Sequence, residues 1–446
     1  MEDWQAIVAA ATFMGVIVFV MTEWIHMTIA AFLGAMLLVF TSVMTLTEAI
    51  GYIGRSYPTL ALFFGVMVLV RAFEPTGIFE YLATQMVVLA RGQGKRLLLG
   101  IVAITTPICA VLPNATTVML LAPLIPTMAL EVGVDFVPLL ILMVFVANSA
   151  GLLTLVGDPA TFIVGDAINI SFTDYLMRLS FGGVVAIATI LVMLPFLFPQ
   201  IWRTQLSNLD QLPHPQINHP RVLGLGAVIV ALMLLFFTIG DYLPVPVSPA
   251  ASALMGAALA LLLAHHSKID HINHILRDVD WSTLLFFMCI FVLIGGLEKT
   301  GVIGGLSGIL AVLLGQNILL GSVVLLFVIG LASSVVPNIP LVVAMVPLLK
   351  QYLVSVELAD AAILSPTFDG NLPETTLPLF YAMMFGATLG GNGTLVGASS
   401  NIVAAGIAEL HGRRIPFKRF LTYGLPVMIM QLITAAIYVV GRFFLL

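Results

Sequence analysis

The stretch "GGNGTLVGASSN", residues Gly390 to Asn401, decides the fold of this chain. It contains four glycines, two asparagines and no charged residue, and apolar runs of about 13 and about 9 residues flank it. At 1.5 Å per residue, neither run alone spans the roughly 30 Å of a bilayer core. The pattern therefore predicts one membrane helix over 377–410 that is broken near the bilayer midplane.

The composition indicates an integral, multi-pass membrane protein surrounded by lipid. Of 446 residues, 60% are hydrophobic and 9% charged, with a mean hydropathy of +1.13, whereas soluble domains carry about 25% charged residues. The net charge of -5 and the scattered Lys and Arg give no basic face for nucleic acid. Cys109 and Cys289 lie in apolar runs and form no disulfide or metal-binding pattern. The first apolar run lacks a cleavage site, which favours a retained helix in a bacterial inner membrane.

The apolar runs predict an all-α fold of about ten membrane crossings and two re-entrant hairpins. Two crossings are interrupted by glycine-rich stretches, at 137–169 and 377–410, and two Pro-Asn pairs mark the hairpins, at 97–131 and 318–355. The remaining runs are long enough to cross unbroken, and they cover 5–22, 27–46, 58–73, 180–201, 222–240, 249–265, 282–297 and 424–444.

The positive charges orient these crossings. With the hairpins turning back, 12 of the 17 Lys and Arg fall on one side, and the other five are Arg55, Arg178, Lys299, Lys350 and Arg442. Because positive loops face the cytoplasm, both termini lie outside and the linker 202–221 is cytoplasmic. If each Pro-Asn segment crossed once instead, this bias would largely disappear.

The chain contains an internal repeat. "YPTLALFFGVMVLVRAFEPTGI" from Tyr57 matches "WSTLLFFMCIFVLIGGLEKTGV" from Trp281 at an offset of 224, which also places Pro113-Asn114 on Pro337-Asn338. A short insertion follows, and "GLLTLVG" from Gly151 then overlies "GNGTLVG" from Gly391 at an offset of 240. The copies are 1–201 and 222–446. Each has five crossings, so the second is inverted, a pattern typical of secondary transporters.

Broken helices and hairpin tips predict the binding site. Free carbonyls of an unwound segment can bind a cation, and the positive N-terminal end of a half-helix can face an anion. Candidate substrate ligands are Asn114, Thr116, Asn338, Thr154, Thr394, Asn392, Ser399 and Asn401. Candidate ion-coupling residues, which would also be the ligands of a bound Na⁺, are Asn114, Asn148, Ser149, Gly151, Gly157, Asp158, Asn338, Gly391, Gly393 and Gly397. The alternative for the glycine-rich stretches is a loop at the membrane surface, and the alternative for each Pro-Asn segment is a kinked continuous helix. No other cofactor is expected.

Asp158 is the one obvious carboxylate within a broken helix, and its repeat counterpart is Ala398. A charge at this depth costs about 2.5–3.5 kcal/mol. Either Asp158 binds sodium or a proton for transport, or it caps the helix that starts at Pro159. Glu74 and Glu298 lie at helix ends and are interpreted as structural. The histidines of residues 265–274 are interpreted as solvated side chains of a cytoplasmic loop.

The motifs resemble a known family. "PNATTVMLLAP", "TLVGDPATFIVG", "VVPNIPLVVAMVP" and "GGNGTLVGASSNIVAAGIAELHG" are similar to the arsenite-permease and P-protein branch of the ion transporter superfamily, with its citrate-transporter-like domain, and distantly to the divalent anion–sodium symporters. The resemblance implies a homodimer whose scaffold holds a transport domain, here 97–201 and 318–446, that moves like an elevator. The arms beside it would be 78–92 and 302–316.

The hairpin tips depart from the symporters. Those proteins have Ser-Asn-Thr at each tip, whereas this chain has Pro113-Asn114-Ala115 and Pro337-Asn338-Ile339. Only the asparagines carry over, and without the four hydroxyls or a nearby arginine a di- or tricarboxylate is disfavoured. Relatives in the P-protein branch often place an aspartate before the tip asparagine. Proline at both positions removes that carboxylate, which argues against cation coupling at the tips themselves.

The sequence thus predicts a secondary active transporter for a small inorganic ion or oxyanion such as arsenite, coupled to Na⁺ or H⁺. One alternative is a Na⁺/H⁺ antiporter that uses Asp158, and another is an anion channel on the same scaffold. The lack of HExxH, Walker and GxSxG motifs argues against an enzyme.

Overall fold

The protein is described by a computed structural model that covers residues 3–22, 24–205, 217–365, 368 and 370–444. Helices and turns make up this part of the chain, and one isolated bridge, between Gln93 and Gln205, is its only β-type pairing. Eight helices, or nine with one bent pair, are long and apolar enough to cross a membrane. The predicted all-α membrane fold is therefore confirmed. Residues 206–216 of the predicted linker 202–221 lie outside the described residues.

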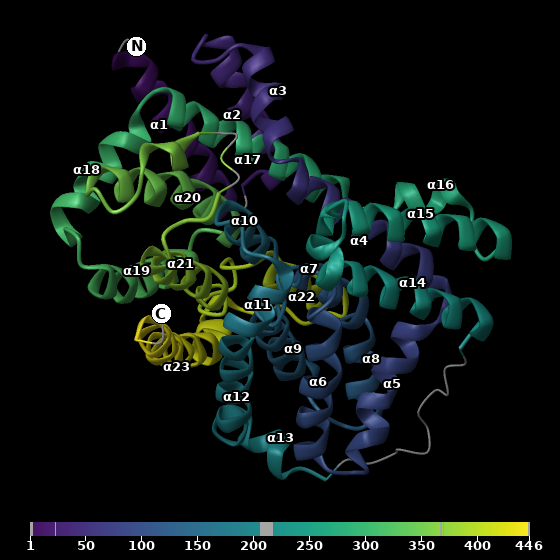
Figure 1. The fold of residues 1–446 in the computed structure, drawn as a ribbon. Coiled ribbons are helices and arrows are strands. Elements are labelled where there is room, and N and C mark those ends of the chain that lie inside the picture. The colour runs from purple at the N-terminus through teal and green to yellow at the C-terminus, as the bar shows by residue number, and fades with distance from the viewer. Residues whose placement is uncertain (1–2, 23, 206–216, 366–367, 369, 445–446) are drawn as a thin grey trace.

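Figure 1 shows the order and arrangement of the helices. Those of the first half are α1 Asp3–Thr22, α2 Met27–Phe40, α3 Leu46–Arg55, α4 Tyr57–Phe73, α5 Ile78–Ala90, α6 Gly94–Cys109, α7 Asn114–Leu121, α8 Leu124–Glu131, α9 Phe136–Ala150, α10 Pro159–Ala167, α11 Phe172–Arg178, α12 Ser180–Leu197 and α13 Pro199–Arg203. Those of the second half are α14 Pro220–Ile239, α15 Pro249–Ser267, α16 Ile272–Arg277, α17 Trp281–Lys299, α18 Val302–Leu314, α19 Ile318–Ser333, α20 Asn338–Ser355, α21 Leu377–Gly390, α22 Ser399–Leu410 and α23 Phe417–Phe443.

Helix starts recur along the chain at the offsets found in the sequence. The helices α4 and α17 start at the equivalent positions Tyr57 and Trp281, and the pairs α5/α18, α6/α19 and α7/α20 keep the same spacing. The second half-helices α10 and α22 start at Pro159 and Ser399, which the larger offset relates. The copies differ in the second arm of the hairpin, because α7 and α8 are separated at Pro123 whereas α20 continues through Pro347.

Equivalent helices make equivalent contacts. The helix α6 packs on α9 as α19 packs on α21, and α4 packs on α15 as α17 packs on α2. Across the two copies, α7 packs on α22 and α20 packs on α10. Each Pro-Asn tip therefore adjoins the broken helix of the other copy, and these elements meet near the middle of the molecule (Figure 1).

Two helix boundaries differ from the prediction. The run 27–46 is helical only to Phe40, because the Thr41 hydroxyl donates to the Leu37 carbonyl at 2.7 Å and Ser42 turns the chain with φ 56°. A separate helix, α3, then starts behind a capping box of Thr45 and Glu48. At the other end, the run predicted from 424 extends back to Phe417, which lengthens α23 to 27 residues.

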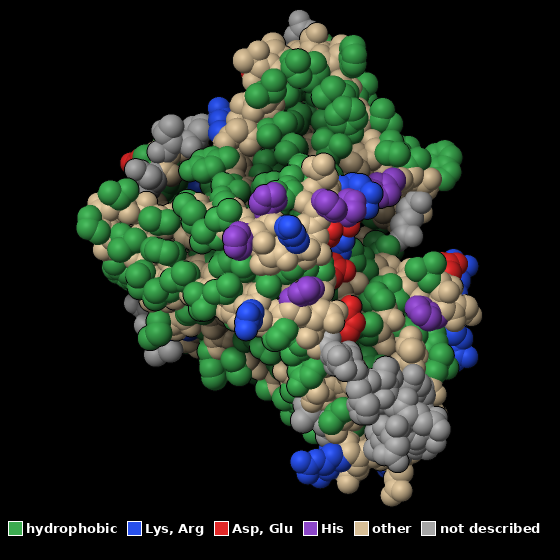
Figure 2. All heavy atoms as spheres, turned by 90° about the vertical axis from the view of Figure 1, so that its right-hand side faces the viewer, with side chains coloured by type: hydrophobic (Ala, Val, Ile, Leu, Met, Phe, Trp, Pro, Cys, Tyr) green, Lys and Arg blue, Asp and Glu red, His purple; other side chains and the backbone are tan. Residues whose placement is uncertain are grey.

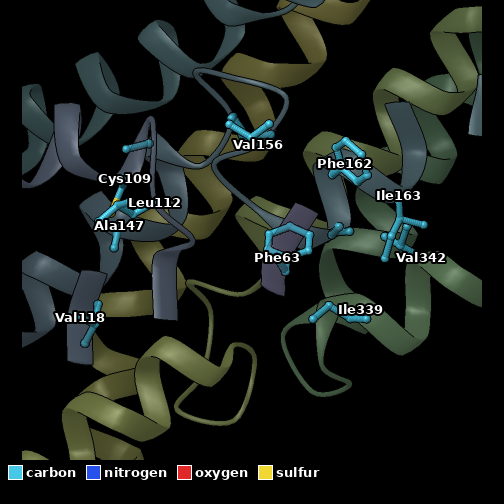
Figure 3. Close-up of a cluster of buried hydrophobic side chains, with 14 of the residues drawn as sticks. Phe63, Cys109, Leu112, Val118, Ala147, Val156, Phe162, Ile163, Ile339 and Val342 are labelled. Carbon is cyan, nitrogen blue, oxygen red and sulfur yellow. The ribbon is translucent and has the colours of Figure 1, made fainter. Parts of the chain in front are cut away.

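Aromatic packing joins α4 to the central elements. The Phe63 ring of α4 lies edge-on to Phe162 of α10 at 6.2 Å between centroids and to Phe287 of α17 at 6.1 Å. Figure 3 shows Phe162, Ile163 and Val342 close together on α10 and α20, with Phe63 beside them. In this apolar region α10 packs against α4, and α20 packs against α17.

The surface is largely apolar. Figure 2 shows hydrophobic side chains over much of one face, with His and charged side chains across its middle and further charged side chains toward its edges. On α14, Leu225 and Val228 are each 54% exposed. Such exposure over several turns is expected of side chains that face lipid.

Candidate functional site

Four helices begin at one place in the centre of the fold. They are α7 at Asn114, α10 after Asp158, α20 at Asn338 and α22 after Ala398. Pro113 and Pro337 precede two of them with nearly identical backbone angles, φ -54° and ψ 141° against φ -53° and ψ 141°. A helix N-terminus carries a partial positive charge, so four such ends surround the same small region.

The Asp158 carboxylate lies at this region and is completely buried. Its Oδ1 accepts hydrogen bonds from Nδ2 of Asn114 at 3.1 Å and Nδ2 of Asn338 at 3.3 Å. Its Oδ2 accepts from the backbone N–H of Thr161 and the hydroxyl of Thr388, both at 3.3 Å. The four donors come from α7, α20, α10 and α21, so both hairpins and both broken helices meet on one carboxylate.

The hydrogen bonds of this arrangement favour the ionised form of Asp158, against the cost of burying the carboxylate completely. An ionised carboxylate only accepts hydrogen bonds, and all four of these partners are donors. The bond from the Thr161 N–H is at the same time a helix N-cap. The two interpretations of Asp158 from the sequence, a cap and an ion-binding group, are thus compatible in the same geometry.

A cluster of neutral side chains extends the site. The Asn148 amide donates to Oδ1 of Asn392 at 3.0 Å and of Asn401 at 3.1 Å, and it accepts from the Ser400 hydroxyl at 2.6 Å. Asn401 in turn donates to the carbonyls of Gly391 and Thr394, at 2.7 and 2.8 Å. The structure therefore uses these two carbonyls of the broken stretch internally.

The glycines of the broken stretches allow close backbone approach. A Cβ on Gly157 would lie 2.6 Å from the Cys109 carbonyl oxygen, and one on Gly397 would lie 3.1 Å from the Ser333 carbonyl oxygen. Cys109 and Ser333 are themselves the last residues of α6 and α19. Both copies thus press the broken stretch against the end of the first hairpin helix. Gly151, Gly391 and Gly393 are similarly crowded.

Four predicted ligands lie outside the central network. The hydroxyl of Thr154 donates to the Ala110 carbonyl at 2.5 Å, and the hydroxyl of Thr394 donates to the Ser334 carbonyl. These bonds fasten each broken stretch to its own hairpin. Thr116 and Ser399 take part in none of the site's hydrogen bonds given above. The structure thus brings together Asn114, Asn148, Ser149, Asp158, Asn338, Asn392 and Asn401.

Two site residues were missed by the sequence reasoning. Thr388 occupies the position of Asn148 at the offset of 240 and donates to Asp158. Gln431 is fully buried in α23 and contacts both Asn392 and Ser149 at 2.8 Å. The available signal was a lone polar residue within an apolar membrane helix, which marks a functional site by default.

A cavity of about 470 Å³ is lined by residues of α10 and α20 that follow the first turn of each helix, and none of the site residues named above lines it. Its walls come from α3, α4 and α17 on one side and from α10 and α20 on the other. Arg55 and Glu298 line it from the first side, and Asp166 and Lys350 line it from the second. We name this cavity the vestibule. Since α10 and α20 both start at the Asp158 site, these two helices connect that site to the vestibule.

Asp135, Arg413 and Arg419 form ion pairs at the start of α9, and none of these residues lines the vestibule. We name them the ionic clamp. Asp135 caps α9 and pairs with Arg413 at 3.2 Å and Arg419 at 2.8 Å. Partial burial alone would raise the pKa of Asp135, but hydrogen bonds from Arg419, the Val137 N–H and Arg413 outweigh it and hold the pKa below its usual value. The clamp joins the loop before α9 to the connection between α22 and α23.

The histidines and cysteines give no site of their own. Within the described ranges, no group of three or more His, Cys, Asp or Glu could hold a metal ion. Nδ1 of His274 lies 3.1 Å from Oδ1 of Asp270, and the His274 side chain is exposed. Cys109 and Cys289 are buried and free.

Comparison with known proteins identifies the family of this chain. The family model described as "Citrate transporter" matches residues 17–368. The chain belongs to the citrate transporter family. A protein of Synechocystis sp. described as an uncharacterized transporter is 71% identical over 439 residues, with 98% of each chain covered. The human P protein is 28% identical over 513 residues, covering 96% of this chain and 59% of the human protein.

A solved structure shares the fold of this citrate transporter family member. The Alcanivorax borkumensis YdaH transporter, described as having an unusual topology, superposes with a TM-score of 0.59 at 12% identity, covering 89% of this chain and 87% of that chain. The suspected membership of the ion transporter superfamily is confirmed. The protein is an integral, multi-pass membrane transporter, and its family is one of transporters rather than enzymes.

Proposed function

We propose that this protein is a secondary active transporter in which Asp158 binds and releases the coupling cation, Na⁺ or H⁺, while a small inorganic anion is carried with it. One observation carries the proposal. A single buried carboxylate receives a donor from each of the two hairpins and each of the two broken helices. A cation that binds there contacts every central element at once, so its binding can alter how those elements pack.

The polarity of the surroundings supports an anion as the second solute. The N-termini of α7, α10 and α20 adjoin Asp158 and that of α22 adjoins Asn148, and such ends favour negative charge. When a cation neutralises the carboxylate, these ends remain positive and can attract a small oxyanion. Cation and anion then bind cooperatively, since each makes the other's site more favourable electrostatically.

The family name refers to citrate, but the site favours a smaller solute. A tricarboxylate is bound best by cationic side chains that form charge-assisted, bidentate hydrogen bonds. The side chains bonded at this site are Asn, Gln, Ser, Thr and one Asp. We therefore propose arsenite-like or other small inorganic solutes rather than di- or tricarboxylates.

Na⁺/H⁺ antiport is the second candidate, and one observation favours it. Asp158 is the only acidic side chain in the central hydrogen-bond network of the described chain. A single carboxylate that binds one cation at a time can exchange sodium for a proton without an anion.

We propose an elevator motion between two groups of helices. The vestibule is lined by α3, α4 and α17 and by α10 and α20, which contact one another elsewhere, and α18 and α19 meet at a bend of 119° that suits a re-entrant hairpin arm. The moving part is proposed as 97–201 and 318–446, on a homodimeric scaffold in a bacterial inner membrane with both termini outside. In that motion the vestibule closes as the central helices slide along α4 and α17.

Flux in proteoliposomes tests the proposed coupling. An interior pH dye reports proton movement during sodium pulses with and without arsenite or phosphate, for the wild type and Asp158→Asn. Transport that requires both a cation and the anion, and is lost in the variant, supports cotransport. A sodium-dependent proton signal that needs no anion supports antiport. Equal flux in the wild type and in the variant contradicts both.

The motion has its own test. Glu298→Cys and Lys350→Cys place thiols on opposite walls of the vestibule, and the two native cysteines are buried. A short bifunctional thiol reagent should stop flux in the double variant and leave each single variant active. Anion current that persists after cross-linking would instead indicate a channel.

A further inference from the structure

A groove lies between α14 and α15, which pack side by side at one edge of the molecule (Figure 1). Its volume is about 410 Å³. Its apolar lining is Leu225, Val228 and Ile229 of α14 and Leu259, Leu262 and Leu263 of α15. These residues belong to the first half of α14 and the second half of α15. The groove therefore lies toward the ends at which α14 begins and α15 finishes.

Basic side chains lie at these helix ends. His266, in the last turn of α15, lines the groove itself. Arg221 precedes Leu225 and Val228 by four and seven residues, a spacing that places all three on one face of α14. Lys268 ends α15 two residues beyond His266. Figure 2 views this edge of the molecule and shows His and charged side chains across its middle. The groove is thus apolar along its length and basic at one end.

The acidic side chains of the adjoining elements already have partners. Asp270, between α15 and α16, lies 3.1 Å from Nδ1 of His274. The short helix η1, Glu74–Thr76, contacts α14, and its Glu74 is paired with Arg71. The same Arg71 also pairs with Asp278, at the end of α16. These carboxylates are therefore engaged away from the basic end of the groove.

The cations of the groove suit a phosphate group. Among the described residues, neither Arg221 nor Lys268 belongs to an ion pair. A guanidinium binds phosphate through two parallel N–H bonds, and an ammonium binds it as a point charge. A histidine ring such as that of His266 can donate one further N–H. An apolar groove that ends at such donors is complementary to a molecule with a hydrocarbon chain and a phosphate.

The first copy of the repeat has an equivalent groove without a basic end. The helices α1 and α2 enclose about 650 Å³, and α2 packs on α17 as α15 packs on α4. The described residues that line this groove include no charged side chain. At the offset of 224, the positions of His266 and Lys268 hold Ser42 and Met44. The basic end is therefore particular to the second copy and does not follow from packing two such helices together.

We propose that the groove between α14 and α15 binds one anionic phospholipid, whose acyl chain lies along the groove and whose phosphate lies at Arg221, His266 and Lys268. Lipid tails are as apolar as leucine, so the groove holds the chain while the headgroup decides which lipid binds. Basic sites between membrane helices on the cytoplasmic side bind anionic headgroups, and the positive charges of the sequence assign this end to that side. The site lies outside the part proposed to move.

Native mass spectrometry of the full-length protein in detergent tests the basic end, because it counts bound lipids by mass. In a titration with phosphatidylglycerol, Arg221→Gln and Lys268→Gln should each weaken binding of the first lipid by about fivefold. Binding of phosphatidylcholine, whose headgroup has no net charge, should not change. Arg203→Gln is the matched control, because Arg203 is an exposed cation assigned to the same side and does not line the groove. An equal loss in Arg203→Gln would indicate general attraction to anionic lipid and overturn the site.

The apolar part of the groove is tested by filling it. Leu262 and Leu33 line the two grooves at comparable exposure, 63% and 59%. Leu262→Trp should weaken phosphatidylglycerol binding as much as the loss of one cation does, and Leu33→Trp should leave it unchanged. Equal affinities of these two variants would overturn the proposal. The same spectra report the oligomeric state, and a dimer that dissociates in Leu262→Trp would show that a second copy of the chain covers the groove instead of a lipid.

A soluble headgroup separates a lipid site from a phosphate site. A ligand that binds only the folded protein raises its Tm. Phosphatidylglycerol should raise the Tm of the wild type more than that of the Arg221→Gln, Lys268→Gln double variant, and glycerol phosphate at the same concentration should not raise it. Equal stabilisation by glycerol phosphate would overturn the role of the acyl chain. None of these measurements involves transport, so their outcome is independent of the cation coupling proposed for Asp158.

Discussion

The side-chain amides of Asn114 and Asn338, one from each copy of the repeat, donate to the same atom, Oδ1 of Asp158, at 3.1 and 3.3 Å. The two hairpins of an inverted repeat thus converge on a group that belongs to only one of the copies. The equivalent position of the second copy is Ala398, which gives its helix no side-chain cap. The centre of the transporter is therefore symmetric in its donors and asymmetric in its charge.

Asn114→Ala and Asn338→Ala should each lower flux by roughly 10- to 100-fold, because a hydrogen bond to a charged group is worth about 1.5–3 kcal/mol. The two variants should differ in stability. Asn114 also bonds Asn148 and the Ala115 N–H, whereas the Asn338 amide bonds Asp158. Thermal unfolding of the purified proteins should show a lower Tm for Asn114→Ala. Undiminished flux in either variant would remove that tip from the site.

Gly157→Ala should destabilise the protein by roughly 1–3 kcal/mol, as overpacking does. The added Cβ would meet the Cys109 carbonyl oxygen at 2.6 Å and force the broken stretch away from α6. Gly224→Ala on α14 is the control, because nothing lies within 4 Å of its Cβ. Thermal unfolding in detergent compares the two. Equal Tm values would show that the close approach at Gly157 is not required.

Thr154→Val and Thr394→Val should lower stability more than they alter solute affinity. Each hydroxyl holds a hairpin carbonyl, of Ala110 or Ser334, and a buried acceptor left without its partner costs about 1–3 kcal/mol. Thr106→Val is the matched change, since the Thr106 hydroxyl is buried without a partner. Tm and the concentration dependence of flux separate the two effects. A changed half-saturation concentration at constant Tm would return these threonines to the substrate site.

Glu48→Gln should lower the Tm at neutral pH and have no effect near pH 2. A hydrogen bond from Lys299, followed by those of the Thr45 backbone and hydroxyl, lowers the pKa of Glu48 from 4.5 to about 2. Because the folded pKa is depressed, the stabilisation is present above pH 4.5 and is lost as the pH falls toward 2. A Tm difference between wild type and variant that stays constant over this range would contradict the link between α3 and α17.

The broken stretches and hairpin tips could be predicted because their residues have backbone meanings. Proline ends a helix and removes a donor, and glycine admits close contact. These residues also recur at fixed offsets, so Asn114, Asn338 and Asp158 were found together from the sequence. The boundary between α2 and α3 was not predicted. The hydropathy indicates one run over 27–46, but the chain turns at Thr41 and Ser42 and α2 ends at Phe40.

Thr388 and Gln431 were not predicted, although each is a polar residue that stands among apolar ones. Without periodicity, the sequence does not show which face of α21 or α23 points at the site. The different surroundings of Glu74 and Glu298 could not be predicted from the sequence either. Glu74 is paired with Arg71, but Gly295 stands at the equivalent position beside Glu298, which therefore lines the vestibule. Which of two equivalent residues is paired depends on residues elsewhere in the chain.

The single carboxylate has an electrical consequence. An empty site that crosses the membrane with Asp158 ionised carries one negative charge, and moving a charge through 100 mV of membrane potential is worth about 2.3 kcal/mol. The same site loaded with one monovalent cation carries none. In cation/proton antiport, voltage then biases the resting position of the unloaded protein and not the loaded step, whereas in cotransport a bound monovalent anion gives the loaded step one negative charge again. Because position 398 holds alanine, the duplicated architecture responds to the potential with one elementary charge instead of two.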